Sequence, residues 1–230
     1  HMSGQNQPTR DFPAISRLAR ERCQQCGVRS FTLCAALPDH QLQRLEDMLI
    51  DHSHQHGELV CFAESELDHV AILTEGVLKL SQVLADGREL IVDLLFPGAV
   101  LGLCGEATQH TEAWAVTDVR LCCIPKSKFK GLIEDYPDIE HELLRMKLEQ
   151  LDRARARMTM LGRKSAAERV ASFLVEIAEH HRGCGRHIRD DGVLELELLM
   201  GRRGIADYLG LTIETVSRKV QQLARDGVIT

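Results

Sequence analysis

The spacing of apolar residues changes along the chain from a strand-like to a helical period. After one short amphipathic stretch at residues 42–49, short apolar runs alternate with glycine-containing breaks as far as Ile124. Such runs, bounded by turn residues, are typical of β-strands. From Pro137 onward apolar residues recur at three- and four-residue steps, the period of an amphipathic helix. This order predicts an α+β chain with its sheet first and its helices last.

The strand-like region predicts an antiparallel β-roll or barrel of roughly 80 residues. Asp86-Gly87 is a strong hairpin signal, and Gly57, Gly76 and Pro97-Gly98 mark further turns. The histidine-rich run at residues 51–56 is predicted to be a solvated loop rather than a metal site. The expected strands cover Leu59–Val60, Val70–Leu73, Val77–Val83, Leu90–Leu95, Val116 and Val119–Ile124.

A long helix is predicted from Pro137 to Leu161. Proline suits an early helical position, no other Gly or Pro interrupts the stretch, and Gly162 suits its end. Its apolar residues form a narrow seam on an otherwise charged helix. Such a seam favours pairing with a second copy over packing within one domain. The expected dimer interface comprises Leu144, Leu148, Leu151, Ala154, Met158 and Leu161.

The stretch from Ile205 to Arg225 predicts two helices that meet at a tight corner. Gly210 supplies a left-handed residue that ends the first helix, and Thr212 is a good N-cap for the second. This is the geometry of a helix-turn-helix whose second helix reads DNA. The inner face of that second helix would carry Val216, Val220 and Leu223. An amphipathic helix is expected before it at Ala166–His180.

The outer face of the second helix carries groups suited to base edges. Glu214, Ser217 and Arg218 lie at i, i+3 and i+4, so they share one exposed stripe. A Glu accepts from cytosine N4, an Arg forks onto guanine O6 and N7, and a Ser serves either role. DNA binding is favoured over the alternative of an ordinary polar surface helix. Contacts to the DNA backbone are assigned to Arg202, Arg203, Thr212, Thr215 and Lys219.

The charge and hydropathy of the chain restrict its partners. The formal net charge is -6, but the excess of carboxylates lies before Arg163, which leaves the helix-turn-helix region weakly basic. No apolar run is long enough to span a bilayer, and no secretory signal is visible. We therefore expect a cytoplasmic protein without a membrane partner.

The 8 cysteines of the chain are unevenly placed and indicate metal or redox chemistry. Cys23, Cys26 and Cys34 form a C-x2-C-x7-C pattern. Thiolates are ligands for zinc or iron–sulfur clusters, and nearby cations lower thiol pKa values. Either site usually has four ligands, so a fourth must come from elsewhere. The cations are Arg20, Arg22 and Arg29, and the candidate fourth ligands are Cys122 and Cys123. The expected non-ligands are Cys61, Cys104 and Cys184.

The sequence Leu-Gly-Leu-Thr-Ile-Glu-Thr-Val-Ser-Arg at residues 209–218 resembles the recognition helix of the FNR branch of CRP/FNR transcription regulators. In that branch a Glu-x-x-Ser-Arg triplet reads a TTGAT half-site, and here it falls on Glu214, Ser217 and Arg218. The resemblance covers most of Arg20 to Thr230. It implies a cyclic-nucleotide-binding-like β-roll, a long dimerisation helix and a winged helix-turn-helix, forming a homodimer on palindromic double-stranded DNA. The turn that the family presents to RNA polymerase falls on Asp86, Gly87 and Arg88.

The cysteines are similar to those of FnrN-like members of this branch. There, three N-terminal cysteines and one just before an Ile-Pro hold an oxygen-labile [4Fe-4S] cluster. Matching Cys-x-Ile-Pro places the fourth ligand on Cys122 and leaves Cys123 as a non-ligand. Zinc held by the same residues, or cysteines that merely pack, are the alternatives. The implied ligands are Cys23, Cys26, Cys34 and Cys122.

The sequence departs from family patterns at several points. Cyclic-AMP receptors carry an Arg-Ser pair where Thr111 and Glu112 fall, and a carboxylate there opposes phosphate binding. Gly201 and Gly204 replace a Ser-like cap and an acidic residue, which should loosen the start of the first helix of the helix-turn-helix. Family members continue beyond the position of Thr230 into a wing, so we expect the wing to be missing or truncated. A small strand is predicted from the alternation of Leu194, Leu196 and Leu198.

These features predict an oxygen- or redox-responsive transcription regulator that is not an enzyme. The expected parts are a cluster-binding segment at 1–38, a sensory β-roll at 39–136, a dimerisation helix at 137–162 and a DNA-binding domain at 163–230. One alternative is a cluster-free CRP-like regulator that senses a small molecule or thiol oxidation. Another is a thiol oxidoreductase using Cys23 and Cys26, disfavoured because no βαβ context surrounds them.

Overall fold

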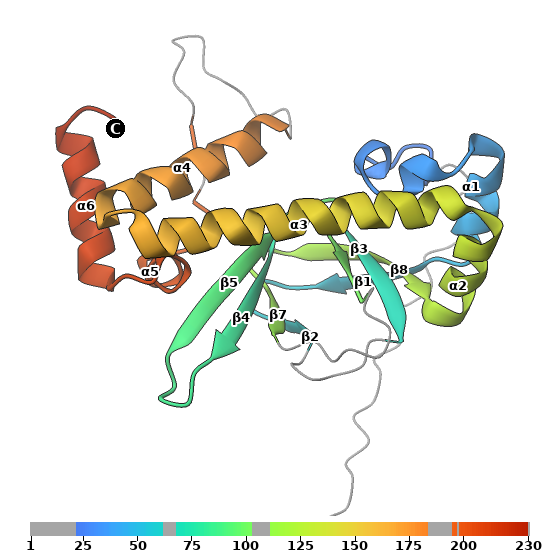
Figure 1. The fold of residues 1–230 in the computed structure, drawn as a ribbon, viewed down its shortest axis with the longest axis horizontal. Helices are drawn as coiled ribbons and strands as arrows, with labels where there is room; N and C mark the ends of the chain where they lie inside the picture. Colours follow the sequence, from blue (N-terminus) through green and yellow to red (C-terminus); the bar gives the residue numbers. More distant parts are fainter. Residues whose placement is uncertain (1–21, 62–67, 103–110, 184–194, 197, 230) are drawn as a thin grey trace, which may run out of the picture.

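A computed structural model of the protein describes residues 22–61, 68–102, 111–183, 195–196 and 198–229. One long helix, α3 (Pro137–Arg163), runs across the molecule as its spine. Figure 1 shows the N-terminal helices at one end of α3, the C-terminal helices at the other, and the β-roll beneath it. The helix was expected from Pro137 to Leu161, and its observed bounds confirm that expectation within two residues.

Two four-stranded antiparallel sheets form the β-roll, with strand orders β1-β8-β3-β6 and β2-β7-β4-β5. Their inward-facing apolar side chains form one core, which includes Leu73, Leu78 and Leu121. The predicted roll is confirmed, although the strand expected at Val116 lies just before that residue. The strands are β1 (Ile50–His54), β2 (Leu59–Cys61), β3 (His69–Glu75), β4 (Leu78–Val83), β5 (Glu89–Leu95), β6 (Val100–Leu101), β7 (Glu112–Ala115) and β8 (Val119–Pro125).

Strand β1 corrects the prediction of a loop at residues 51–56. It pairs antiparallel with β8 from Ile50↔Cys123 to His54↔Val119. Its side chains are mostly exposed, so the strand lacks the apolar alternation by which strands are recognised. Main-chain hydrogen bonds to a neighbour do not depend on side-chain polarity, and the apolar partner β8 therefore determines the pairing.

A second apolar core lies at the N-terminal end of α3. It joins the two 3-10 turns η1 (Arg29–Phe31) and η2 (Leu33–Ala36) to α1 (Asp39–Glu46), α2 (Lys126–Asp135) and the first turns of α3. The amphipathic helix expected at 42–49 is thus confirmed with an earlier start. The N-terminal segment thereby packs on both the sheet and the long helix.

Three further helices form the C-terminal module, namely α4 (Ala166–Gly183), α5 (Arg202–Leu209) and α6 (Ile213–Arg225). Their core is continuous with the outer face of the sheet, because Ile91 and Leu94 of β5 belong to the same buried cluster as Phe173 and Tyr208. The strand predicted around Leu194–Leu198 is wrong where the structure describes it, since residues 195, 196 and 198 are not extended strand. An alternating pattern of apolar and polar residues forms a strand only where a neighbouring strand satisfies its backbone hydrogen bonds.

Candidate functional site

The corner between α5 and α6 has the geometry predicted for a helix-turn-helix. Gly210 adopts the left-handed conformation, with φ 60° and ψ 43°, and the N–H of Leu211 donates to the carbonyl of Ala206 at 3.0 Å. The hydroxyl of Thr212 accepts from the N–H of Thr215 at 3.2 Å, which caps α6. The left-handed glycine therefore sets the turn, and the threonine starts the next helix.

The three residues predicted to read bases lie together on the open side of α6. Glu214 and Arg218 are exposed and Ser217 is half-buried, while Val216 on the opposite face is fully buried. Backbone and Thr212 hydrogen bonds, with Arg218 nearby, lower the pKa of the Glu214 carboxyl. Glu214 is therefore an ionised acceptor at neutral pH, as contact with a cytosine amino group requires.

The residues assigned to the DNA backbone border this face. Arg203 and Thr212 are exposed, and Arg202, Thr215 and Lys219 are half-buried. The ammonium of Lys219 donates to the amide oxygen of Gln222 at 3.0 Å. Helix α5 begins without a side-chain cap at Gly201, as predicted from the loss of a Ser-like residue there.

The second site lies at the far end of α3, where four cysteines from distant parts of the chain meet. Cys23, Cys26 and Cys34 from the N-terminal segment and Cys122 from β8 line one small cavity. The other walls are mostly aliphatic, from Val28, Leu45, Leu49 and Ile72. The structure thus places at one cavity the four cysteines that the family resemblance implies as ligands. Cys104 and Cys184 lie outside the described residues.

The pleat of β8 distinguishes Cys122 from Cys123. Consecutive residues of a strand point to opposite faces of a sheet. Cys122 packs with the N-terminal cysteines at the edge of the core on that side, whereas Cys123 is fully buried between the two sheets. Cys61 is buried in the same inter-sheet core, consistent with its interpretation as a small apolar residue.

Polar groups hold the cysteine segment in place. The N–H of Cys23 donates to a carboxylate oxygen of Glu46 at 2.6 Å, and the N–H of Cys34 donates to the buried hydroxyl of Thr32 at 3.4 Å. The guanidinium of Arg22 lies 4.0 Å from the sulfur of Cys122 and also pairs with Asp51. Sequence reasoning did not identify Glu46 or Thr32, because neither stands in a pattern with the cysteines.

Neighbouring cations lower the thiol pKa values as expected, but burial outweighs them for three of the four cysteines, so that the net shift is upward. Burial is the largest influence and raises the pKa of Cys23 to about 12 and that of Cys34 to about 11. Burial also raises the pKa of Cys122. Arg22 and Arg29 oppose this shift without reversing it, because an apolar wall penalises a thiolate more than one partly solvated guanidinium favours it.

The helix between the two sites presents an unpaired apolar stripe. The exposed fractions of its side chains are 58% for Leu144, 54% for Leu148, 45% for Leu151 and 72% for Met158. Ala154 is exposed as well. Leu161, predicted for the same interface, is instead half-buried against the core of the C-terminal module. The opposite face of α3 buries Ile139, Leu143 and Met160.

Glu112, which falls where cyclic-AMP receptors carry part of an Arg-Ser pair, lies at the start of β7. Its carboxylate accepts from the indole N–H of Trp114 at 2.9 Å, which holds the carboxylate in place. Residues 103–110 lie outside the described part of the chain.

The turn expected to face RNA polymerase is the tight hairpin between β4 and β5, where Gly87 has φ 82° and Arg88 pairs with Asp86.

Together these features define a DNA-binding transcription regulator with a sensory β-roll. The family model of the cyclic nucleotide-binding domain matches residues 52–136, and that of the Crp-like helix-turn-helix domain matches residues 168–230. The chain belongs to the CRP/FNR family of transcription regulators. The expected family and fold class are confirmed.

Two transcription regulators are similar in sequence to this protein over most of its length. It is 38% identical to the transcriptional activator protein FnrL of Cereibacter sphaeroides, covering 90% of this chain and 84% of that protein. It is 35% identical to the nitrogen fixation regulation protein FixK of Bradyrhizobium diazoefficiens, covering 90% and 85%. The solved structure of FixK2 from Bradyrhizobium japonicum superimposes with a TM-score of 0.67 at 30% identity, covering 79% of this chain and 87% of that one.

No helix among the described residues is both long enough and apolar enough to cross a membrane.

Proposed function

We propose that the protein is an oxygen- or redox-responsive regulator of the FNR type. In this proposal Cys23, Cys26, Cys34 and Cys122 hold a [4Fe-4S] cluster, and α6 reads TTGAT-type half-sites in palindromic DNA as part of a homodimer. The observation that carries the proposal is the meeting of these four sulfurs in one apolar cavity, three from one end of the chain and one from β8.

The donor set suits either an iron–sulfur cluster or a zinc ion held by four cysteines. Four thiolates are the usual ligands of a [4Fe-4S] cluster. A zinc ion bonded to each sulfur at about 2.3 Å would require the sulfurs to lie about 4 Å apart. No group of three or more His, Cys, Asp and Glu side chains in the described part of the chain is spaced to hold one metal ion. The choice of a cluster over zinc therefore rests on the resemblance of the cysteine pattern to that of FnrN-like proteins.

When bound, such a cluster supplies an oxygen-labile cross-link between its ligands. The protein's own contribution is to connect those ligands to the dimer helix. Cys23, Val28 and Leu33 belong to the same buried core as Ile139 and Leu143 of α3. A change in how the cysteine segment packs is therefore transmitted directly to the first turns of α3.

The exposed stripe of α3 supports the homodimer. It lies opposite the face that packs on the chain's own sheets, so a second copy of α3 can cover it. A two-fold dimer would present two equivalent α6 helices to a palindrome about one DNA turn apart. The β4–β5 hairpin at Asp86, Gly87 and Arg88 is the proposed contact with RNA polymerase.

Anaerobic purification, followed by absorption spectroscopy and assays of iron and sulfide, tests the cluster. Equilibrium sedimentation before and after exposure to air then tests the coupling. We expect about four iron atoms per chain, and a dimer that dissociates in air together with loss of operator binding. A colourless protein that reconstitutes no cluster would support instead a regulator that senses a small molecule or thiol oxidation.

A further inference from the structure

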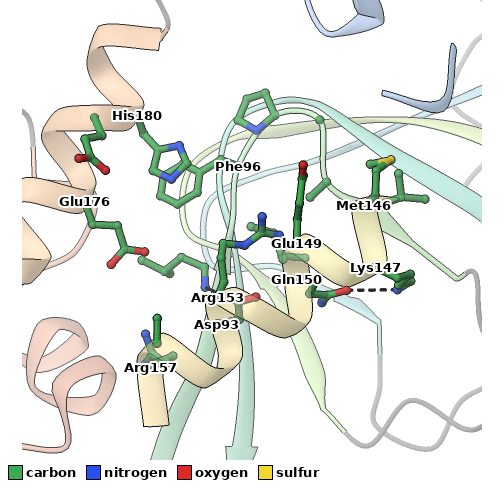
Figure 2. Close-up of a pocket in the computed structure, with 18 of the residues that line it drawn as sticks. Asp93, Phe96, Met146, Lys147, Glu149, Gln150, Arg153, Arg157, Glu176 and His180 are labelled. Atoms are coloured by element: carbon green, nitrogen blue, oxygen red, sulfur yellow. Dashed lines mark hydrogen bonds between the residues drawn. The ribbon is translucent and has the colours of Figure 1, made fainter. Parts of the chain in front are cut away.

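One arginine of α3 joins the three parts of the molecule whose relative placement matters for DNA binding. A guanidinium nitrogen of Arg157 (Nη2) donates to the carbonyl of Ile91 in β5 and to that of Tyr208 in α5, each at 2.7 Å. The guanidinium carbon also lies 3.5 Å from the centroid of the Tyr208 ring. Figure 2 shows Arg157 beside Asp93, at the end of the cavity nearest the C-terminal helices.

Further partly buried contacts extend the junction into α4. The hydroxyl of Tyr208 donates to the carboxylate of Glu176, at 2.8 and 2.9 Å from its two oxygens. Arg169, also from α4, donates to the carbonyls of Leu161 and Leu209 at 2.5 and 3.0 Å. The junction is therefore built from oriented polar contacts as well as from the shared apolar core.

Polar contacts of this kind restrict orientation more than apolar packing does. A guanidinium is planar, and its fork engages two acceptors only when both lie in its plane. At Arg157 a single nitrogen, Nη2, donates to carbonyls of two different elements. The other terminal nitrogen, Nη1, is buried without a hydrogen-bond partner among the described residues. An unsatisfied buried donor costs free energy, which the contacts of Nη2 must offset.

A cavity of about 470 Å³ lies beside Arg157, but its lining does not indicate a particular ligand. Charged groups on its wall largely engage neighbours of their own, as Lys164 does with Ser172 and Glu149 with Arg145. The arginine contacts across the domain junction are the stronger observation.

We infer that Arg157 is a positioning residue for DNA recognition, which sets the orientation of the two α6 helices and so the half-site spacing that the dimer accepts. This inference rests on the proposed dimeric, DNA-reading function. Helix α6 packs on α5, α5 is tied to β5 through Arg157, and Arg157 itself belongs to the helix that carries the dimer stripe. Half-site spacing mirrors the separation of the recognition helices.

The test compares full-length, anaerobically prepared wild type with Arg157→Lys and Arg157→Gln. The matched control is Arg145→Gln, because Arg145 lies on the same helix and pairs only on its surface, with Glu142 and Glu149. Fluorescence anisotropy measures binding to duplexes with two TTGAT-type half-sites at the preferred spacing and at spacings longer and shorter by one base pair. A duplex with one half-site reports base selectivity alone.

We expect both Arg157 variants to lose about tenfold or more of the preference for the best spacing, while base selectivity on the single half-site stays unchanged. Arg157→Lys retains the charge and so remains informative if Arg157→Gln fails to fold, which thermal unfolding followed by circular dichroism reveals. Arg145→Gln should keep the wild-type spacing profile.

Two outcomes overturn the inference. One is a wild-type spacing profile in Arg157→Lys. The other is tighter binding of either Arg157 variant at every spacing, which would mean that the junction holds α6 away from DNA. Failure of the wild type itself to bind any of the duplexes would refute the proposed function instead, so the two failures are distinguishable.

Discussion

Cys122 and Cys123 are adjacent on β8 yet belong to different cores, because Cys122 faces the three N-terminal cysteines and Cys123 lies fully buried between the two sheets. Of the two neighbours, Cys122 is therefore the one that lines the cavity with the N-terminal cysteines.

Replacing these two cysteines should have opposite consequences. Cys122→Ser is expected to abolish retention of iron and sulfide, since it removes one of four soft ligands. Cys123→Ala should retain both, at a modest cost in stability for a smaller buried side chain. Iron and sulfide per chain after anaerobic purification are the measurement. If the two variants lost equal amounts of iron and sulfide, the assignment of Cys122 rather than Cys123 as the ligand would be contradicted.

Glu214→Ala should remove base discrimination at one position of each half-site. The ionised carboxylate is exposed and aligned with Ser217 and Arg218, and loss of one direct base contact costs about 1–3 kcal/mol. Base discrimination is measured as the affinity of each variant for a set of duplexes that differ by single base changes in the half-site. Lys219→Ala serves as the comparison, because loss of a phosphate contact weakens binding to all sequences alike. If Glu214→Ala weakened binding to all of the duplexes equally, Glu214 would have a structural role rather than a role in reading bases.

Leu148→Glu should dissociate the dimer. The side chain is 54% exposed in the single chain, and burying a leucine in an interface contributes about 1.5–3 kcal/mol, which corresponds to about ten- to a hundredfold in the dissociation constant. Sedimentation equilibrium measures the shift. Val175→Glu is the matched control, because Val175 is 56% exposed on α4 and away from the stripe. A dimer constant unchanged in Leu148→Glu would exclude this face as the interface.

Thr212→Ala should destabilise the helix-turn-helix without altering its base preference. The hydroxyl caps α6 by accepting from the N–H of Thr215, and loss of such a cap costs about 0.5–2 kcal/mol. Urea unfolding measures the change. Thr159→Ala removes a threonine from the interior of α3, whose hydroxyl donates only to the carbonyl of Arg155, and should cost less. Equal midpoints for the two variants would contradict the capping role.

Features carried by local sequence were predictable from sequence alone. The left-handed turn at Gly210, the cap at Thr212 and the uninterrupted helix from Pro137 depend on backbone chemistry within a few residues. The apolar stripe of α3 and the reading face of α6 follow from helical periodicity alone.

Other features depended on contacts between distant residues. The polar strand β1 exists because β8 pairs with it, and the strand expected at Leu194–Leu198 does not form where described because alternation supplies no partner. The net shift of the thiol pKa values also differed from expectation, since burial raises them, and the cavity that the thiols line is closed partly by residues distant in sequence such as Ile72.

The sequence by itself therefore determined the exposed polar face of α6, the apolar stripe of α3 and the cysteine pattern. Only the tertiary structure decided that the four thiols line one cavity and that Arg157 ties the DNA-binding module to β5. The physical reason is range. Helical period, caps and turns act over a few residues, whereas strand pairing, burial and a guanidinium shared between two elements exist only after distant segments have packed together.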